Sequence, residues 1–112
     1  MNRWIQGLLI TLLILLMAPG LGNTEGSSEG AELFQQHCAA CHINGGNIIR
    51  RGKNLKLKAL ERQGIASVDA IAQIAREGVG QMSGYGELLG PGGDQIVAEW
   101  IWEQAQKAWI QG

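Results

Sequence analysis

The stretch Cys38-Ala39-Ala40-Cys41-His42 organises this chain of 112 residues. Two cysteines separated by two residues lie about one helical turn apart, so both sulfurs can reach the two vinyl groups of one haem. The next residue can then turn its imidazole toward the iron. The motif therefore predicts one covalently attached haem c, with Cys38 and Cys41 as attachment points and His42 as an iron ligand.

Other uses of paired cysteines fit this sequence less well. A zinc site needs four ligands, and beyond the cysteines the chain offers only His37 and His42, crowded into the same turn. A thioredoxin-like redox pair needs a preceding strand and a βαβ unit, whereas the residues before Cys38 have a helical pattern. The alternative that stays open is a small exported helical domain with a disulfide.

Length and charge limit the possible classes of protein. The chain is long enough for one small domain, and its formal net charge of -1 is too low to neutralise many phosphates, which argues against nucleic-acid binding. Both cysteines lie within the motif, so haem attachment would leave no structural disulfide. A domain of this size is marginally stable alone, and a buried haem would enlarge its core.

The N-terminal segment differs in composition from the rest. Residues 4–18 are largely apolar, Arg3 precedes them, and Ala18, Gly20 and Gly22 are small residues at positions compatible with cleavage. The apolar run is shorter than the ~20 residues of a membrane-spanning helix. We therefore predict a cleaved signal peptide over residues 1–22 and a mature domain over 23–112, with a retained membrane anchor as the alternative. Export agrees with haem attachment, which takes place after the chain has crossed a membrane.

The remaining pattern predicts several helices joined by glycine-rich loops. Residues 23–30 are polar and are expected to form a flexible lead-in, with the first helix starting at Gly30. Gly30 and Phe34 share a face, and the glycine would let another helix cross closely. Further helices are expected over 55–62, over 68–77 with Ser67 as N-cap, and over 94–110. In the last helix, Trp102 and Trp109 are spaced for one stripe, either in the core or exposed.

Basic residues are concentrated between positions 50 and 62. This window holds six of the nine Lys and Arg residues and one acid, Glu61. Such a run is often only a solvated face. Beside a haem it could also orient an acidic partner. The six bases are Arg50, Arg51, Lys53, Lys56, Lys58 and Arg62.

Met82 is the candidate for the second axial ligand. Met1 and Met17 belong to the predicted signal peptide, so Met82 is the single methionine of the predicted mature chain. A methionine usually fills gaps in a core, but the expected loop over residues 79–93 is a poor place for burial. His37 is the competitor, although its neighbour Cys38 ties it to the attachment side of the haem.

These residues resemble class I monohaem cytochromes c, and within them cytochrome c6 of cyanobacteria and algae. The resemblance spans residues 30–109. It rests on Gly30, Phe34, the haem motif, Gly78 placed four residues before Met82, and the ending that leads to Trp109. It implies an all-α fold with three to four helices around one haem, in which the first and last helices cross near Gly30, Phe34 and Trp100. It also implies His42 and Met82 as the axial ligands.

The resemblance further implies a soluble, monomeric electron carrier without enzymatic activity. Its expected location is the thylakoid lumen or the periplasm. Its expected partners are the cytochrome b6f complex as donor and photosystem I or a terminal oxidase as acceptor, which it would dock against without spanning the membrane. A ligand-binding or sensing haem c module with an open iron site is the alternative. Met82 discriminates between them, because a filled sixth position blocks ligand chemistry.

The chain departs from the common cytochrome c6 pattern near the expected methionine side of the haem. Ser83 stands where a proline usually follows the ligand methionine, and Ile74 stands where a glutamine is usual. The apolar residue at position 74 is similar to the branches called c6B and c6C, and implies that Ile74 contacts the haem region and lowers the potential. Many class I cytochromes orient the haem histidine through a proline carbonyl. Only Pro19 and Pro91 exist here, so another carbonyl must take that role.

Overall fold

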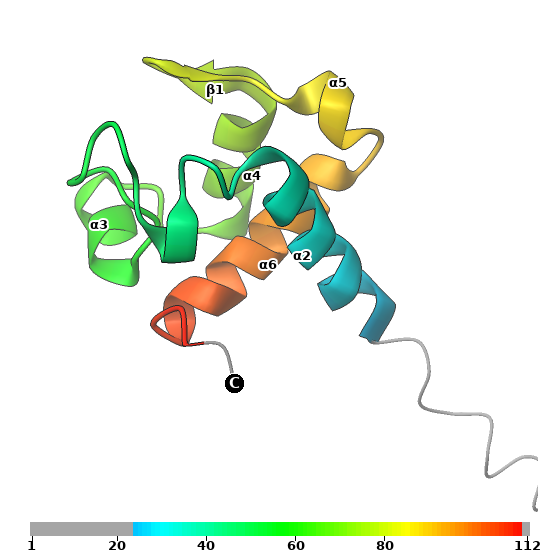
Figure 1. Cartoon of the computed structure of the whole chain (residues 1–112), viewed down its shortest axis with the longest axis horizontal. Coiled ribbons are helices and arrows are strands. Elements are labelled where there is room, and N and C mark those ends of the chain that lie inside the picture. The colour runs from blue at the N-terminus through cyan, green and yellow to red at the C-terminus, as the bar shows by residue number, and fades with distance from the viewer. Residues whose placement is uncertain (1–23, 111–112) are drawn as a thin grey trace, which may run out of the picture.

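The computed structural model describes residues 24–110 of the chain (Figure 1). The predicted signal peptide over residues 1–22, its cleavage site and its alternative as an anchor lie outside the described residues. No helix within 24–110 combines the length and the apolar character needed to cross a membrane. The elements in chain order are α2 (Thr24–His37), the 3-10 turn η1 (Ile43–Gly45), α3 (Leu57–Arg62), α4 (Val68–Glu77), β1 (Gly78–Val79), β2 (Met82–Ser83), α5 (Gly86–Leu89) and α6 (Gly93–Gln106).

Helices α2 and α6 cross at Gly30, as the sequence predicts (Figure 1). A Cβ at Gly30 would lie 2.6 Å from Cβ of Trp100 and 2.9 Å from the carbonyl oxygen of Ile96, so only glycine allows this approach. The Phe34 and Trp100 rings pack beside the crossing, with their centroids 4.9 Å apart.

The start of α2 corrects one expectation. The helix begins at Thr24, so the polar segment predicted as a flexible lead-in continues the helix toward the N-terminus. The segment contains no proline that would interrupt the helix.

Helix α4 follows its sequence signals closely. The Ser67 hydroxyl accepts a hydrogen bond from the backbone N–H of Ala70 at 3.2 Å, which confirms the predicted N-cap. Its apolar stripe buries Ile71, Ala72 and Ala75 against α6. The helix stops at Gly78, whose φ of 79° lies in the left-handed region that favours glycine.

The segment after α4 is more ordered than the predicted irregular loop. Strands β1 and β2 form a short antiparallel hairpin in which Gly78 pairs with Ser83 and Val79 with Met82. A Cβ at Gly78 would lie 2.5 Å from the carbonyl oxygen of Met82, so the close pairing needs glycine. The backbone N–H of Tyr85 then donates to the carbonyl oxygen of Ala75 at 2.8 Å, which fastens the hairpin to α4.

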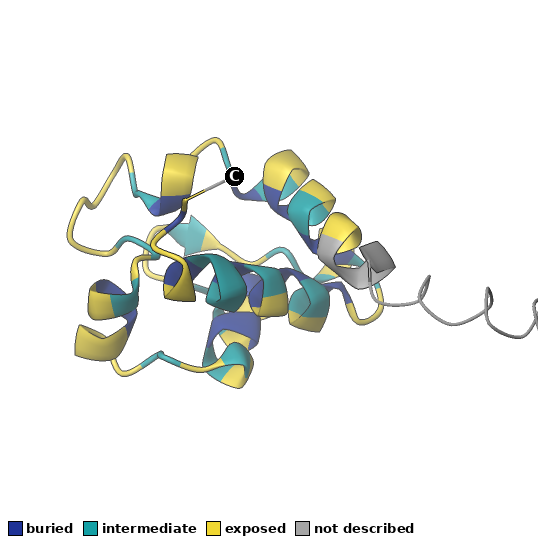
Figure 2. Cartoon of the chain, turned by 90° about the horizontal axis from the view of Figure 1, so that it is seen from below, coloured by how far each residue is buried: buried dark blue, intermediate teal, exposed yellow. Residues whose placement is uncertain are grey.

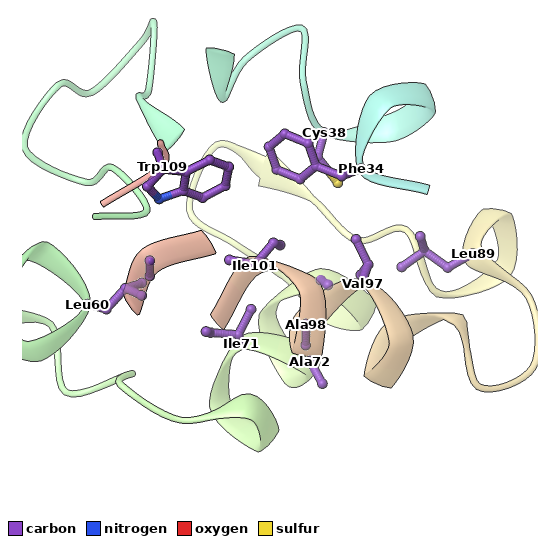
Figure 3. Close-up of a cluster of buried hydrophobic side chains, with 12 residues drawn as sticks. Phe34, Cys38, Leu60, Ile71, Ala72, Leu89, Val97, Ala98, Ile101 and Trp109 are labelled. Atoms are coloured by element: carbon purple, nitrogen blue, oxygen red, sulfur yellow. The ribbon is translucent and has the colours of Figure 1, made fainter. Parts of the chain in front are cut away.

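The C-terminal end corrects the predicted helix over residues 94–110. Helix α6 ends at Gln106, and the chain reverses through Ala108 and Trp109, which have φ values of 53° and 59°. The predicted stripe of Trp102 and Trp109 is therefore wrong. The left-handed conformation costs a residue with a Cβ about 1–2 kcal/mol. The cost is offset by burial of the Trp109 ring, which lies beside Phe34 in the core (Figure 3).

The core lies where α2, α4 and α6 face one another. Buried residues gather on these inner faces, and exposed residues cover the outer ones (Figure 2). The expected all-α architecture is confirmed, with the two-residue strands as an addition. The buried apolar members of the core are Phe34, Cys38, Leu60, Ile71, Ala72, Ala75, Leu89, Val97, Ala98, Ile101, Ala105 and Trp109.

Candidate haem site

A cavity of about 600 Å³ lies between the haem motif, α4 and the hairpin. Its volume falls within the range of roughly 300–1,000 Å³ that is typical of ligand and cofactor sites. Leu60, Ile71, Ile74 and Ile101 give it apolar walls. All five predicted site residues line this one cavity, namely Cys38, Cys41, His42, Ile74 and Met82.

The two cysteines are positioned by a turn that continues from α2. The backbone N–H of Cys38 donates to the carbonyl oxygen of Phe34 at 2.8 Å, and that of His42 donates to the carbonyl oxygen of Cys38 at 3.0 Å. Cys38 is buried and Cys41 is exposed, and the two thiols are not joined by a disulfide. The pKa of the Cys38 thiol is raised to about 11, mainly by burial and to a smaller extent by the nearby Cys41 thiol.

His42 is buried and its ring orientation is held by one hydrogen bond. Nδ1 donates to the carbonyl oxygen of Gly46 at 2.7 Å, and only 8% of the residue is exposed. A carbonyl can only accept, so in the neutral ring the proton sits on Nδ1 and Nε2 keeps its lone pair. A free Nε2 opposite a hydrogen-bonded Nδ1 is the usual state of a metal-ligating histidine. The Gly46 carbonyl is therefore the acceptor that the sequence predicts in place of a proline carbonyl.

Met82 reaches the cavity from the hairpin, forty-four positions beyond Cys38 in the sequence. Met82 is partly buried, and its backbone pairing with Val79 fixes its position on β2. The competitor His37 also lines the cavity, with its ring centroid 6.2 Å from that of Tyr85. Both candidate ligands therefore border the same space.

Ile74 lines the cavity from α4 and is partly buried. It follows Ile71 by three residues, so both project from the same side of the helix toward the cavity. Since an isoleucine side chain carries no donor or acceptor, this part of the wall is apolar.

Two further residues at the cavity were not identified from the sequence. Tyr85 lines the wall next to His37. Asn47 folds the loop after the motif, because its Oδ1 accepts from the backbone N–H groups of Ile49 and Arg50 and its Nδ2 donates to the carbonyl oxygen of Lys53. An asparagine after two glycines is a turn signal that could have indicated the second role.

The basic segment borders the mouth of the cavity. All six of its Lys and Arg residues are exposed, and Arg50 and Lys53 line the cavity itself. Within residues 24–110, none of the six forms an ion pair with an acid of this chain. The neighbouring residues Ile48, Ile49 and Val79 are exposed apolar side chains.

The chemistry of this donor set fits a haem c. Two thiols, an imidazole with a free nitrogen and a thioether face one largely apolar cavity. Among the described residues, no group of three or more His, Cys, Asp or Glu side chains is placed to hold a bare metal ion.

Comparisons with known proteins agree with this arrangement. Residues 26–101 match the family described as cytochrome C oxidase, cbb3-type, subunit III. A protein named cytochrome c6-like from Nostoc sp. is 42% identical over 97% of this chain and 99% of its own length.

Solved structures of cytochrome c6 variants are similar to this fold. Cytochrome c6B from Synechococcus sp. WH8102 superposes with a TM-score of 0.75 at 73% identity, covering 77% of this chain and 98% of that one. Cytochrome c6C from Synechococcus sp. PCC 7002 gives a TM-score of 0.68 at 48% identity, covering 70% of this chain and 96% of that one.

Proposed function

Because the chain belongs to the cytochrome c6 family, whose members hold one covalent haem c, we propose that it carries single electrons through a haem attached at Cys38 and Cys41 and ligated by His42 and Met82. The observation that carries the proposal is the shared cavity, which is lined by all four of these side chains. A haem in such a site supplies one-electron exchange between ferric and ferrous iron.

The protein's own residues determine how that exchange is controlled. The Gly46 carbonyl keeps the His42 proton on Nδ1 and leaves Nε2 available as a ligand. Leu60, Ile71 and Ile101 give the cavity apolar walls, and a low dielectric around the haem would disfavour the additional charge of the ferric state. Within the described part of the chain, the lining of the cavity includes no Asp or Glu, and Cys38, Cys41 and His42 are assigned to the haem, so electron transfer without substrate chemistry is the function that we propose.

The proposed sixth ligand is Met82 rather than His37. His37 adjoins Cys38 in the sequence, and both the cysteine and the proposed ligand His42 belong to the same short turn. Met82 comes from a separate element, the hairpin fastened to α4 by the Tyr85 to Ala75 hydrogen bond. A thioether ligand favours ferrous iron, as suits an electron carrier of high potential.

Ile74 is proposed to contact the haem region and to set the potential below that of ordinary cytochrome c6. The similarity to cytochrome c6B and c6C supports this assignment, because it agrees with the resemblance from which the role of Ile74 is predicted. A lower potential would reduce the driving force for electron transfer from the cytochrome b6f complex.

We propose that an acidic redox partner docks at the cavity mouth. Arg50 and Lys53 lie at that mouth with unpaired charges, and Ile49 and Val79 provide apolar area beside them. Complementary charge speeds and orients such encounters. The proposed partners are the cytochrome b6f complex and photosystem I or a terminal oxidase, reached as a monomer in the thylakoid lumen or periplasm.

The test begins with the purified holoprotein. Mass spectrometry of the denatured protein should show one haem retained on the chain, whereas the mass of the apoprotein would refute attachment through Cys38 and Cys41. The oxidised protein should show the weak near-infrared band of methionine-ligated ferric haem. Met82→Ala should abolish that band and admit carbon monoxide, while His37→Ala, the matched control, should leave both properties unchanged.

Two outcomes would change the assignment. If His37→Ala removes the ligand signature and Met82→Ala does not, the iron is held by two histidines. If the unmodified protein already binds carbon monoxide readily, the open-iron module is the correct function.

A further inference from the structure

A continuous set of contacts joins the C-terminal tryptophan to the loop that orients His42. The indole Nε1–H of Trp109 donates to the carbonyl oxygen of Leu55 at 3.1 Å. The backbone N–H of Leu55 donates to the carbonyl oxygen of Gly45 at 2.7 Å. The next residue, Gly46, supplies the carbonyl that accepts the proton of His42 Nδ1.

The indole ring also presses directly on this loop. Its atoms lie so close to Gly45 that a Cβ at that position would overlap them. On its other sides the ring packs against Phe34, at a centroid distance of 5.4 Å, and edge-on against Trp100, at 5.7 Å. The Gly45 backbone therefore lies against a rigid aromatic cluster.

The backbone at this end of the chain is strained to keep the ring there. Ala108 and Trp109 both adopt positive φ values, a conformation that is unfavourable for residues with a Cβ. Such strain persists only where surrounding contacts over-determine it, and it concentrates at functional sites. Here the contacts that hold the ring are the Leu55 carbonyl, Gly45 and the aromatic neighbours.

From these contacts we propose that Trp109 is a positioning residue for the haem ligand His42. By fixing Leu55 and Gly45, it holds the Gly46 carbonyl at hydrogen-bonding distance from Nδ1. The inference rests on the proposed role of His42 as an iron ligand. It extends that role to a residue 67 positions away in the sequence, which is not among the residues that line the cavity.

The proposal predicts a direction for the redox potential. A hydrogen bond from Nδ1 to a carbonyl makes the imidazole a stronger donor, and a stronger donor stabilises ferric iron. Loosening the Gly46 carbonyl should weaken this effect and raise the potential. We expect a change of about threefold in the ferric-to-ferrous equilibrium constant, which is about 28 mV at 59 mV per tenfold change for one electron.

The experiment compares two matched variants of the holoprotein. Trp109→Phe keeps an aromatic ring in the core but removes the N–H and part of the contact with Gly45. Trp102→Phe makes the same chemical change on α6 at a partly buried residue that donates no side-chain hydrogen bond within the described part of the chain. Redox titration and proton exchange of His42 Nδ1–H in the ferrous protein, followed by NMR, are the two measurements.

Trp109→Phe should raise the potential and speed exchange of the Nδ1 proton, while Trp102→Phe should change neither. If Trp109→Phe fails to fold, replacement of Trp109 by 3-benzothienylalanine removes only the N–H and should give the same two shifts. Equal potentials and exchange rates in all variants would overturn the inference. Wild-type spectra without histidine ligation would instead overturn the proposed function on which it rests.

Discussion

Substitution of Gly30 by alanine tests the helix crossing on which the core depends. The added Cβ would lie 2.6 Å from Cβ of Trp100 and 2.9 Å from the carbonyl oxygen of Ile96, against an optimal separation of roughly 3.5–4.0 Å for carbon atoms. The Ile96 oxygen is a backbone atom of α6 and the Trp100 Cβ is bonded directly to that backbone, so neither atom can move aside by side-chain rotation. The helices would have to separate by about 1 Å, which would loosen the Phe34 and Trp100 packing.

The expected size of the effect follows from two opposing contributions. Overpacking a close contact costs roughly 1–3 kcal/mol, and alanine gains roughly 0.5–1 kcal/mol over glycine within a helix. With the overpacking cost at its upper end because the contact is so short, Gly30→Ala should lower the free energy of unfolding by about 2 kcal/mol. For a domain of this size, the melting temperature should fall by roughly 8–16 °C.

The assay is thermal unfolding of the oxidised holoprotein, followed by far-ultraviolet circular dichroism. Gly52→Ala is the matched control, because a Cβ at that exposed position would meet nothing within 4 Å. It should leave stability unchanged or raise it by about 0.4–1 kcal/mol. If Gly30→Ala melts at the same temperature as Gly52→Ala, or higher, the helices do not cross as closely as described.

Three further experiments test the site and its surroundings. Ile74→Gln should raise the redox potential by about 40 mV, or about 1 kcal/mol, because the amide adds a dipole that favours the ferrous form. If redox titration gives the variant a potential equal to or lower than that of the wild type, Ile74 does not have this role. Charge reversal of Arg50 and Lys53 should slow association with an acidic partner in stopped-flow measurements. The wild-type association rate should also fall as added salt shortens the Debye length from ~30 Å to ~10 Å. If neither rate changes, these bases form only a solvated surface. Ser67→Ala should lower the free energy of unfolding by about 1 kcal/mol because it removes the α4 N-cap. The control Ser83→Ala, at an exposed position, should lower it by less than about 0.5 kcal/mol, and equal melting temperatures for the two variants would argue against the cap.

Features that depend on neighbours in the sequence were predictable from the sequence alone. The spacing of Cys38, Cys41 and His42 indicates haem attachment because a helical turn brings both sulfurs to one side. Ser67 and Gly78 mark the two ends of α4 because capping and positive φ are local properties. Elimination singled out Met82, and the structure brings it to the same cavity as His42, although its ligation stays a prediction.

Features that depend on contacts between distant segments were decided only by the tertiary structure. The apolar pattern continues past Gln106, but the chain turns there because Trp109 gains a hydrogen bond to Leu55, 54 residues earlier, and a place beside Phe34. The acceptor for His42 Nδ1 is likewise a glycine carbonyl, a group that every residue has and that no side chain distinguishes. The sequence indicated that a carbonyl other than a proline's must accept this hydrogen bond, and only the structure identified it as that of Gly46. At the C-terminal turn, burial of the Trp109 ring outweighs the local preference of two residues for a helix.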